Sequence, residues 1–221
     1  MTVPNHIAGL LLESGAVVVA PEQPITWTSG LRAPIYCDNR LLISSPPARK
    51  AVIDEFEAVI KNRSISCEVI AGTATAGIPW ATLLADRLGL PMVYVRSSPK
   101  GHGTGRQVEG GIPHGAETFV IEDLISTGGS ARTSIEALRR EHHADITAVL
   151  SIFTYELLAA KETFDRLGVP LISLCTFGQV VEQVKAEFPV EVYHHLCAWQ
   201  KDPQAWSEQN GRLLDDLAHI W

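Results

Sequence analysis

The sequence lacks any apolar run of the roughly 18–20 residues that a membrane-spanning helix requires. No basic residue precedes an apolar core between Met1 and Leu12, so we expect no signal peptide. The 221 residues are 46% hydrophobic and 19% charged, an ordinary globular composition that excludes intrinsic disorder, fibrous repeats and coiled coils. This length predicts one large domain, or one domain with a small appendage.

Positive charge and paired cysteines are also scarce. The 18 Lys and Arg residues face 25 Asp and Glu residues, a formal net charge of -7. Because attraction to phosphates dominates nucleic-acid affinity, a chain this acidic is a poor general nucleic-acid binder, although a locally basic pocket can hold a small anion. The four cysteines are widely spaced without a CxxC pair, so we expect reduced thiols in a cytoplasmic protein and no zinc site.

Two common catalytic motifs are missing as well. There is no Gly-Lys-Ser/Thr, which argues against a P-loop ATPase, and no Gly-x-Ser-x-Gly of a serine hydrolase.

The order of the predicted elements indicates an α/β fold. From Glu68 onward, short apolar runs alternate with helical patterns, which is typical of βαβ units with a central, mostly parallel sheet flanked by helices. The predicted strands are 69–71, 92–95, 118–121, 146–153 and 170–174, and the predicted helices between them are 79–88, 130–140 and 156–167. Thr176 and Gln179 form a capping box for a further helix.

These patterns divide the chain into three parts. Residues 1–66 form a small N-terminal subdomain, residues 67–200 the α/β core, and residues 201–221 a polar tail helix that we expect to pack on the surface. In open parallel sheets, ligands bind beyond the carboxyl ends of the strands, so the residues that follow the strands are the candidates for a site.

The most informative segment follows the strand that ends at Ile121. Two carboxylates, Glu122 and Asp123, precede a loop of hydroxyls and paired glycines that opens a helix. Glycines allow backbone N–H groups to surround an anion, and the helix dipole adds to the attraction. The acids are suited to accept hydrogen bonds from a vicinal diol. We interpret the segment as a ribose-5-phosphate cradle; the alternative is a tight turn with a capping serine and solvated acids.

Two further loops also suit a pyrophosphate. Residues 97–111 contain Lys100, His102, Arg106 and five glycines, so we expect a mobile loop whose cations close over an anion. The alternative is a basic but disordered surface loop. Residues 72–77 carry only small side chains between a strand and a helix, which permits close backbone approach to pyrophosphate or simply makes a tight turn.

Several motifs in order carry a resemblance to a known family. Residues 119–130 resemble the 5-phosphoribosyl-1-diphosphate (PRPP) motif of type I phosphoribosyltransferases. Residues 27–30 and 34–40 are similar to the N-terminal hood of the orotate phosphoribosyltransferases, and residues 94–103 are similar to their mobile catalytic loop. The resemblance covers roughly residues 5 to 200 and implies a type I phosphoribosyltransferase fold with a small hood over the base.

The resemblance also implies an activity and its residues. The reaction is transfer of phosphoribosyl from PRPP to orotate, giving orotidine 5'-monophosphate and pyrophosphate, with Mg2+ held mainly by PRPP and no metal site in the protein. Lys100 and Asp123 are the implied catalytic residues, and Ser126 the implied orotate contact. The implied PRPP-binding residues are Arg96, Lys100, His102, Glu122, Asp123, Leu124, Ile125, Ser126, Thr127, Gly128, Gly129 and Ser130. The implied assembly is a homodimer in which the basic loop, residues 97–111, is shared between subunits.

The sequence departs from the family pattern at three positions. Thr28, Ala76 and Tyr155 stand where many relatives carry basic residues, so the orotate contacts beyond Ser126 are not specified. Two other functions remain open: a phosphoribosyltransferase for another base, such as a purine, and a PRPP-sensing regulator that binds DNA or RNA. The hood segment 38–40 argues against the first, and the net charge with no DNA-binding module argues against the second.

Overall fold

The computed structural model describes residues 6–218, apart from 22, 28–29, 100–104 and 186–187. Its centre is a six-stranded sheet in the order β10-β9-β8-β5-β6-β7, in which only β7 runs antiparallel to its neighbour. The strands are β5 (Val69–Thr73), β6 (Met92–Val95), β7 (Val108–Glu109), β8 (Glu117–Ile125), β9 (Asp145–Thr154) and β10 (Leu171–Thr176). The mostly parallel α/β sheet expected from the sequence is thus confirmed.

Strand alternation gives each face of the sheet its own core. Ile70 and Phe119 pack on one face with the helices α2 (Pro46–Arg63) and α3 (Gly77–Leu88). Ala71 and Val120 pack on the other face with α4 (Gly129–His142) and α5 (Leu158–Leu167). Both cores consist of fully buried aliphatic and aromatic side chains, which is the arrangement expected for a parallel sheet covered on both sides.

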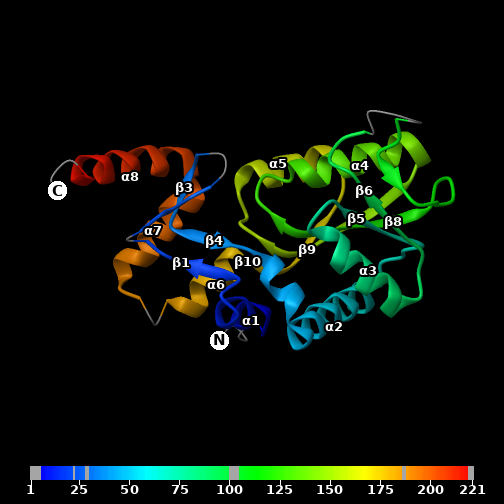
Figure 1. Ribbon diagram of the computed structural model, residues 1–221, viewed down its shortest axis with the longest axis horizontal. Coiled ribbons are helices and arrows are strands. Elements are labelled where there is room, and N and C mark those ends of the chain that lie inside the picture. The colour runs from blue at the N-terminus through cyan, green and yellow to red at the C-terminus, as the bar shows by residue number, and fades with distance from the viewer. Residues whose placement is uncertain (1–5, 22, 28–29, 100–104, 186–187, 219–221) are drawn as a thin grey trace.

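The N-terminal and C-terminal segments of the chain pack against each other beside the sheet (Figure 1). From the N-terminal side come α1 (His6–Glu13), β1 (Val17–Val19), β2 (Ile25–Thr26), β3 (Arg32–Ala33), β4 (Ile35–Cys37) and the 3-10 helix η1 (Asn39–Ser44). From the C-terminal side come α6 (Phe177–Val184), α7 (Val190–Lys201) and α8 (Pro203–Ala218). β1 pairs with β4 and β2 with β3, both antiparallel, and α8 packs on β3. We call residues 25–40 the hood.

Three details differ from the sequence-based expectation. β8 continues to Ile125, so Glu122 and Asp123 lie within the strand rather than after it. Val108 and Glu109 form the edge strand β7 inside the segment that we expected to be a loop. The helix α7 was not foreseen, and its Trp199 is fully buried. None of the helices within the described residues is long and apolar enough to cross a membrane.

Candidate functional site

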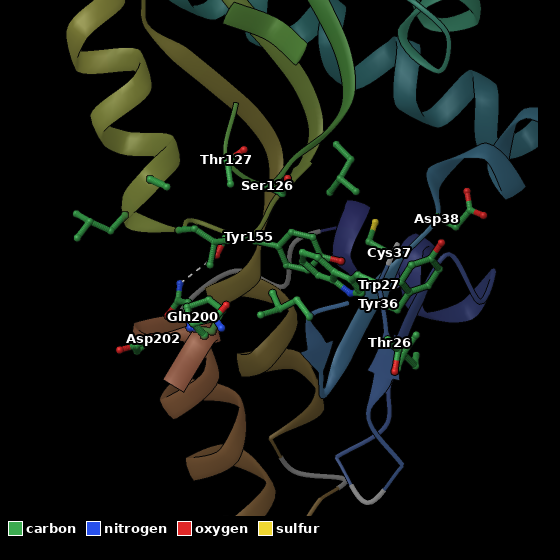
Figure 2. Close-up of a pocket in the computed structure, with 18 of the residues that line it drawn as sticks. Thr26, Trp27, Tyr36, Cys37, Asp38, Ser126, Thr127, Tyr155, Gln200 and Asp202 are labelled. Carbon is green, nitrogen blue, oxygen red and sulfur yellow. Dashed lines mark hydrogen bonds between the residues drawn. The ribbon is translucent and has the colours of Figure 1, made fainter. Parts of the chain in front are cut away.

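A cleft of about 860 Å³ lies between the carboxyl ends of the strands and the hood. Its walls come from five segments of the chain: the hood, Ala76 before α3, the end of β8 with the loop that follows, residues 155–159 after β9, and the junction of α7 with α8 at residues 200–204. Figure 2 shows Ser126 and Thr127 at the end of β8, with Trp27 and Tyr155 near the centre of the lining. The cleft is therefore where the topology of a parallel sheet places a ligand.

The two adjacent acids of β8 lie in different environments because neighbouring strand residues face opposite sides. Asp123 lines the cleft, whereas Glu122 is absent from its lining and is 5% exposed. Burial, together with the charge of Asp123, raises the pKa of Glu122 to about 8, although a hydrogen bond with Thr73 opposes the shift. Burial also raises the pKa of Asp123. Of this pair, only Asp123 is placed to contact a ligand in the cleft.

The hood is tied directly to the strand that carries Asp123. The buried Asn39 donates from Nδ2 to the carbonyl oxygen of Asp123 at 2.6 Å. Next to it, Arg40 holds Asp38 through two bonds, Nε to Oδ1 at 2.6 Å and a terminal guanidinium nitrogen to Oδ2 at 2.7 Å. This pairing lowers the pKa of the Asp38 carboxyl. Both charged side chains line the cleft, but each is already engaged by the other.

The glycine loop after β8 leaves the start of α4 open. Gly128 occupies the N-cap position with φ of 79°, a left-handed conformation that favours glycine, and no side chain caps the helix. The first N–H groups of α4 are therefore free to bind an anion. Ser126 and Thr127 line the cleft beside this terminus. Ile125, Gly128, Gly129 and Ser130 do not line it directly.

The small-residue loop 72–77 contains two glycines that are required by the packing of the protein itself. A Cβ on Gly77 would lie 2.3 Å from the carbonyl oxygen of Ile121, and one on Gly72 would lie 2.9 Å from Cβ of Ala81. The glycines therefore bring α3 against the sheet. The Ala74–Thr75 peptide bond is cis, and Ala76, which lines the cleft, is the N-cap residue of α3 and makes no side-chain cap. The N–H of Ile78 donates to the carbonyl of Thr75 and Pro79 has no N–H, so Gly77 is the first-turn residue whose N–H can serve a ligand there.

The basic loop is anchored at its base. The backbone N–H of Arg96 donates to the carbonyl of Gln107, and the Gln107 side-chain amide donates back to the carbonyl of Arg96 at 2.7 Å. The Arg96 guanidinium lies 3.8 Å from the carboxylate of Glu109 and does not line the cleft. The carboxylate of Glu141 accepts from the backbone N–H groups at the start of β7. Lys100 and His102 lie outside the described residues.

Trp27 and Tyr155 form an aromatic wall of the cleft. The Trp27 and Tyr155 rings lie 5.1 Å apart, and each lies within 6 Å of the buried Trp199 ring. Burial raises the pKa of the Tyr155 hydroxyl, although a hydrogen bond with the backbone of Cys37 opposes that shift. The resemblance already marked Tyr155 as a position where many relatives carry a basic residue, but the packing of its ring against Trp27 and Trp199 follows only from the structure.

The junction of α7 with α8 is a wall of the cleft that sequence reasoning missed. Gln200 donates from Nε2 to the carbonyl oxygen of Tyr155 at 3.4 Å, the dashed line in Figure 2. Residues 200–204 lie far from the other lining segments in the sequence, and they carry no glycine-rich or hydroxyl-rich pattern. Nothing in the sequence alone therefore marks them as part of a site.

Comparison with known proteins agrees with this geometry. The family model described as "Phosphoribosyl transferase domain" matches residues 43–167. An orotate phosphoribosyltransferase of Bacillus cereus (strain ATCC 10987 / NRS 248) is 48% identical over 206 residues, covering 91% of this chain and 98% of the relative. One from Cutibacterium acnes is 44% identical over 216 residues, covering 94% of this chain and 99% of the relative.

Solved structures show the same similarity. The orotate phosphoribosyltransferase of Aeropyrum pernix superposes with a TM-score of 0.72 at 33% identity, covering 81% of this chain and 98% of that one. The UMP synthase of Leishmania donovani superposes with a TM-score of 0.74 at 23% identity, covering 90% of this chain and 42% of that one, and shows likeness of fold alone.

Proposed function

This chain belongs to the orotate phosphoribosyltransferases, and from that premise we propose that it transfers the 5-phosphoribosyl group of PRPP to orotate. The products are orotidine 5'-monophosphate and pyrophosphate, a step in the synthesis of pyrimidine nucleotides. The observation that carries the proposal is the position of Asp123 in the cleft beside the uncapped start of α4. Asp123 offers a carboxylate for sugar hydroxyls, and Thr127, which also lines the cleft, directly precedes the uncapped start of α4, whose N–H groups suit a phosphate.

We assign the parts of the substrate to these groups as follows. The 5-phosphate binds at the start of α4, where Ser126 and Thr127 add hydroxyl donors. Asp123 accepts hydrogen bonds from the ribose hydroxyls and stabilises the positive charge that develops on the ring as the anomeric C–O bond breaks. Orotate N1 is the nucleophile, so the protein needs no nucleophile of its own.

The leaving pyrophosphate is assigned to the basic loop and the loop 72–77. Lys100, Arg96 and His102 supply positive charge, and the backbone N–H of Gly77 at the start of α3 supplies a donor where Ala76 brings no charge. Closure of the loop over the cleft would exclude water, which otherwise hydrolyses the activated sugar.

The residues of the cleft fit a magnesium ion that is held mainly by PRPP. Magnesium prefers oxygen ligands and usually binds through one or two carboxylates with phosphate oxygens, and Asp123 offers such a carboxylate. No cluster of three or more metal-ligating side chains occurs within the described part of the chain. When bound, the ion would neutralise charge on the pyrophosphate.

We also propose a homodimer in which each loop reaches the site of its neighbour, and a cytoplasmic location. The cysteines within the described residues are all unpaired thiols, which suits a reducing compartment.

The decisive experiment follows the consumption of orotate by the purified protein with PRPP and magnesium, and repeats it with purine bases. We expect turnover of orotate alone. Asp123→Asn should lower kcat by roughly 10²–10³-fold, the usual loss for one preorganised electrostatic contact. Asp145→Asn, an exposed carboxyl at the opposite end of the sheet, is the matched control. Purine turnover without orotate turnover would favour another base, and PRPP binding without any turnover would favour a regulator.

A further inference from the structure

The junction of α7 with α8 is held firmly in place at the edge of the cleft. Besides the bond from Gln200 to Tyr155, the backbone N–H of Arg32 in β3 donates to the hydroxyl of Ser207 at 2.9 Å. Trp206 is 4% exposed and packs into the core. A residue at this junction therefore has a defined position relative to the hood and the strand ends.

Within the described residues, the charged side chains that line the cleft are Asp38, Arg40, Asp123, Lys201 and Asp202. Arg40 and Asp38 neutralise each other in a bidentate pair. The Asp202 carboxylate accepts from the backbone N–H of Ala205 at 3.0 Å and so caps α8; in Figure 2 it points away from Tyr155. The carboxylates of Asp38 and Asp202 are thus both bonded to partners within the protein.

Lys201 is the remaining cation in this lining. It is exposed at the last turn of α7, and it forms no ion pair or hydrogen bond among the residues that the structure describes. Facing the same cleft are Trp27 and Tyr155, whose rings form an apolar wall. The junction therefore places an ammonium group, without a partner among the described residues, in the same cleft as two aromatic rings tilted by 41° to each other.

Orotate has the chemistry that this pairing would recognise. It is a planar pyrimidine that carries one carboxylate, and a carboxylate that leaves water beside an apolar wall needs a cation to compensate its lost hydration. We propose that Lys201 binds the carboxylate of orotate and sets the preference for a carboxylated pyrimidine over an uncharged one. This inference rests on the proposed function, and it assigns to the C-terminal segment a role in choosing the base.

The test compares Lys201→Gln and Lys201→Arg with wild type in steady-state kinetics at saturating PRPP. A hydrogen bond to a charged group contributes about 1.5–3 kcal/mol, so Lys201→Gln should raise the KM for orotate roughly 10-fold or more. The Kd for PRPP should stay within twofold, and Lys201→Arg should recover most of the loss. Lys61→Gln, which removes an exposed lysine on α2, is the control and should leave every constant unchanged.

Uracil, which is orotate without the carboxylate, separates recognition from structure. Its inhibition constant should be the same for wild type and Lys201→Gln, because the lost contact is to a group that uracil lacks. An orotate KM within twofold of wild type, or an equal loss for orotate and uracil, would overturn the proposal. If uracil inhibits neither protein measurably, the orotate KM alone decides. Failure of wild type to consume orotate would instead refute the proposed function.

Discussion

At the residue scale, Gly77 begins α3 where the helix touches β8. Because an added Cβ would lie 2.3 Å from a backbone oxygen of Ile121, neither partner can move aside without shifting the sheet. We expect Gly77→Ala to lower the free energy of unfolding by about 1–3 kcal/mol, the usual cost of overpacking. Gly111→Ala is the control, since nothing lies within 4 Å of that position. Urea unfolding measures the stability of both variants, and equal free energies of unfolding would contradict this account.

Glu122 should make the stability of the protein depend on pH. Its pKa is about 8 in the folded protein and about 4.5 when the chain is unfolded, so the folded state keeps a proton that the unfolded state releases. The contribution of Glu122 to the free energy of unfolding is therefore fully present below pH 4.5 and is lost as pH rises toward 8. Glu122→Gln, neutral at every pH, should gain more than about 1 kcal/mol relative to wild type between pH 5 and pH 8.

Urea unfolding at pH 5, 6.5 and 8 measures this gain. Glu55→Gln, an exposed carboxyl on α2, is the control and should keep the slope of wild type. A constant difference between Glu122→Gln and wild type across this range would show that Glu122 ionises normally.

The sequence predicted ligand contacts for both Glu122 and Asp123, whereas the structure places only Asp123 in the lining of the cleft. The apolar run ends at Ile121, so the strand was expected to end there, whereas β8 continues through four more residues by pairing with β9. Strand alternation then sends the two acids to opposite faces. The extension depends on a neighbouring strand far along the chain, and a local pattern does not contain that information.

At the element scale, the bond between Asn39 and β8 couples the hood to the site. Asn39→Ala removes a buried donor from the Asp123 carbonyl and should lower the free energy of unfolding by about 1–3 kcal/mol. Because the same strand carries Asp123, kcat/KM for orotate should fall as well. Asn62→Ala, exposed on α2, is the matched control. Thermal unfolding and steady-state kinetics check the two effects, and unchanged kinetics in a destabilised protein would limit Asn39 to a structural role.

Elements with a strong local signal were predictable. The capping box of α6 is present in full: the Thr176 side chain accepts from the backbone N–H of Gln179, and the Gln179 side chain accepts from the backbone N–H of Thr176. It was predictable because this motif depends only on four consecutive residues. The helix α7 was missed although most of its residues are hydrophobic, because only Leu196 and Trp199 among them are buried and the segment carries no capping signal. Its stability comes from packing against distant elements, which a single segment does not reveal.

At the scale of the whole molecule, the proposed sharing of loops between subunits can be tested by mixing variants. Lys100→Ala and Asp123→Ala should each be nearly inactive. In an equal mixture with free exchange, half of the dimers are mixed and each regains one intact site of two, so roughly a quarter of wild-type activity should return.

The mixing experiment needs proof that subunits exchange, which mass spectrometry of differently tagged chains provides. Size-exclusion chromatography with light scattering establishes the dimer itself. Activity that stays at the level of the parents despite proven exchange would place Lys100 in the site of its own chain and would refute the shared loop.

The joining of the two chain ends was the least predictable feature of the molecule. Arg32 and Ser207 are bonded although they lie 175 positions apart, and the sequence gives no reason to pair them. The tail was expected on the surface because it is polar, yet Trp206 is buried and residues 200–204 border the cleft. The central fold follows from its repeated βαβ pattern, whereas the walls of the site depend on contacts of very long range.

The position of residues 200–207 near the end of the chain also determines the order in which the sheet and the cleft can form. During synthesis on the ribosome, β5, β6, β8 and β9 leave the exit tunnel before residues 200–207, so the sheet can assemble while one wall of the base pocket has not yet been translated. Contacts that close the longest loops carry the largest entropic cost and form late. A newly made chain therefore becomes compact before it becomes able to hold its base.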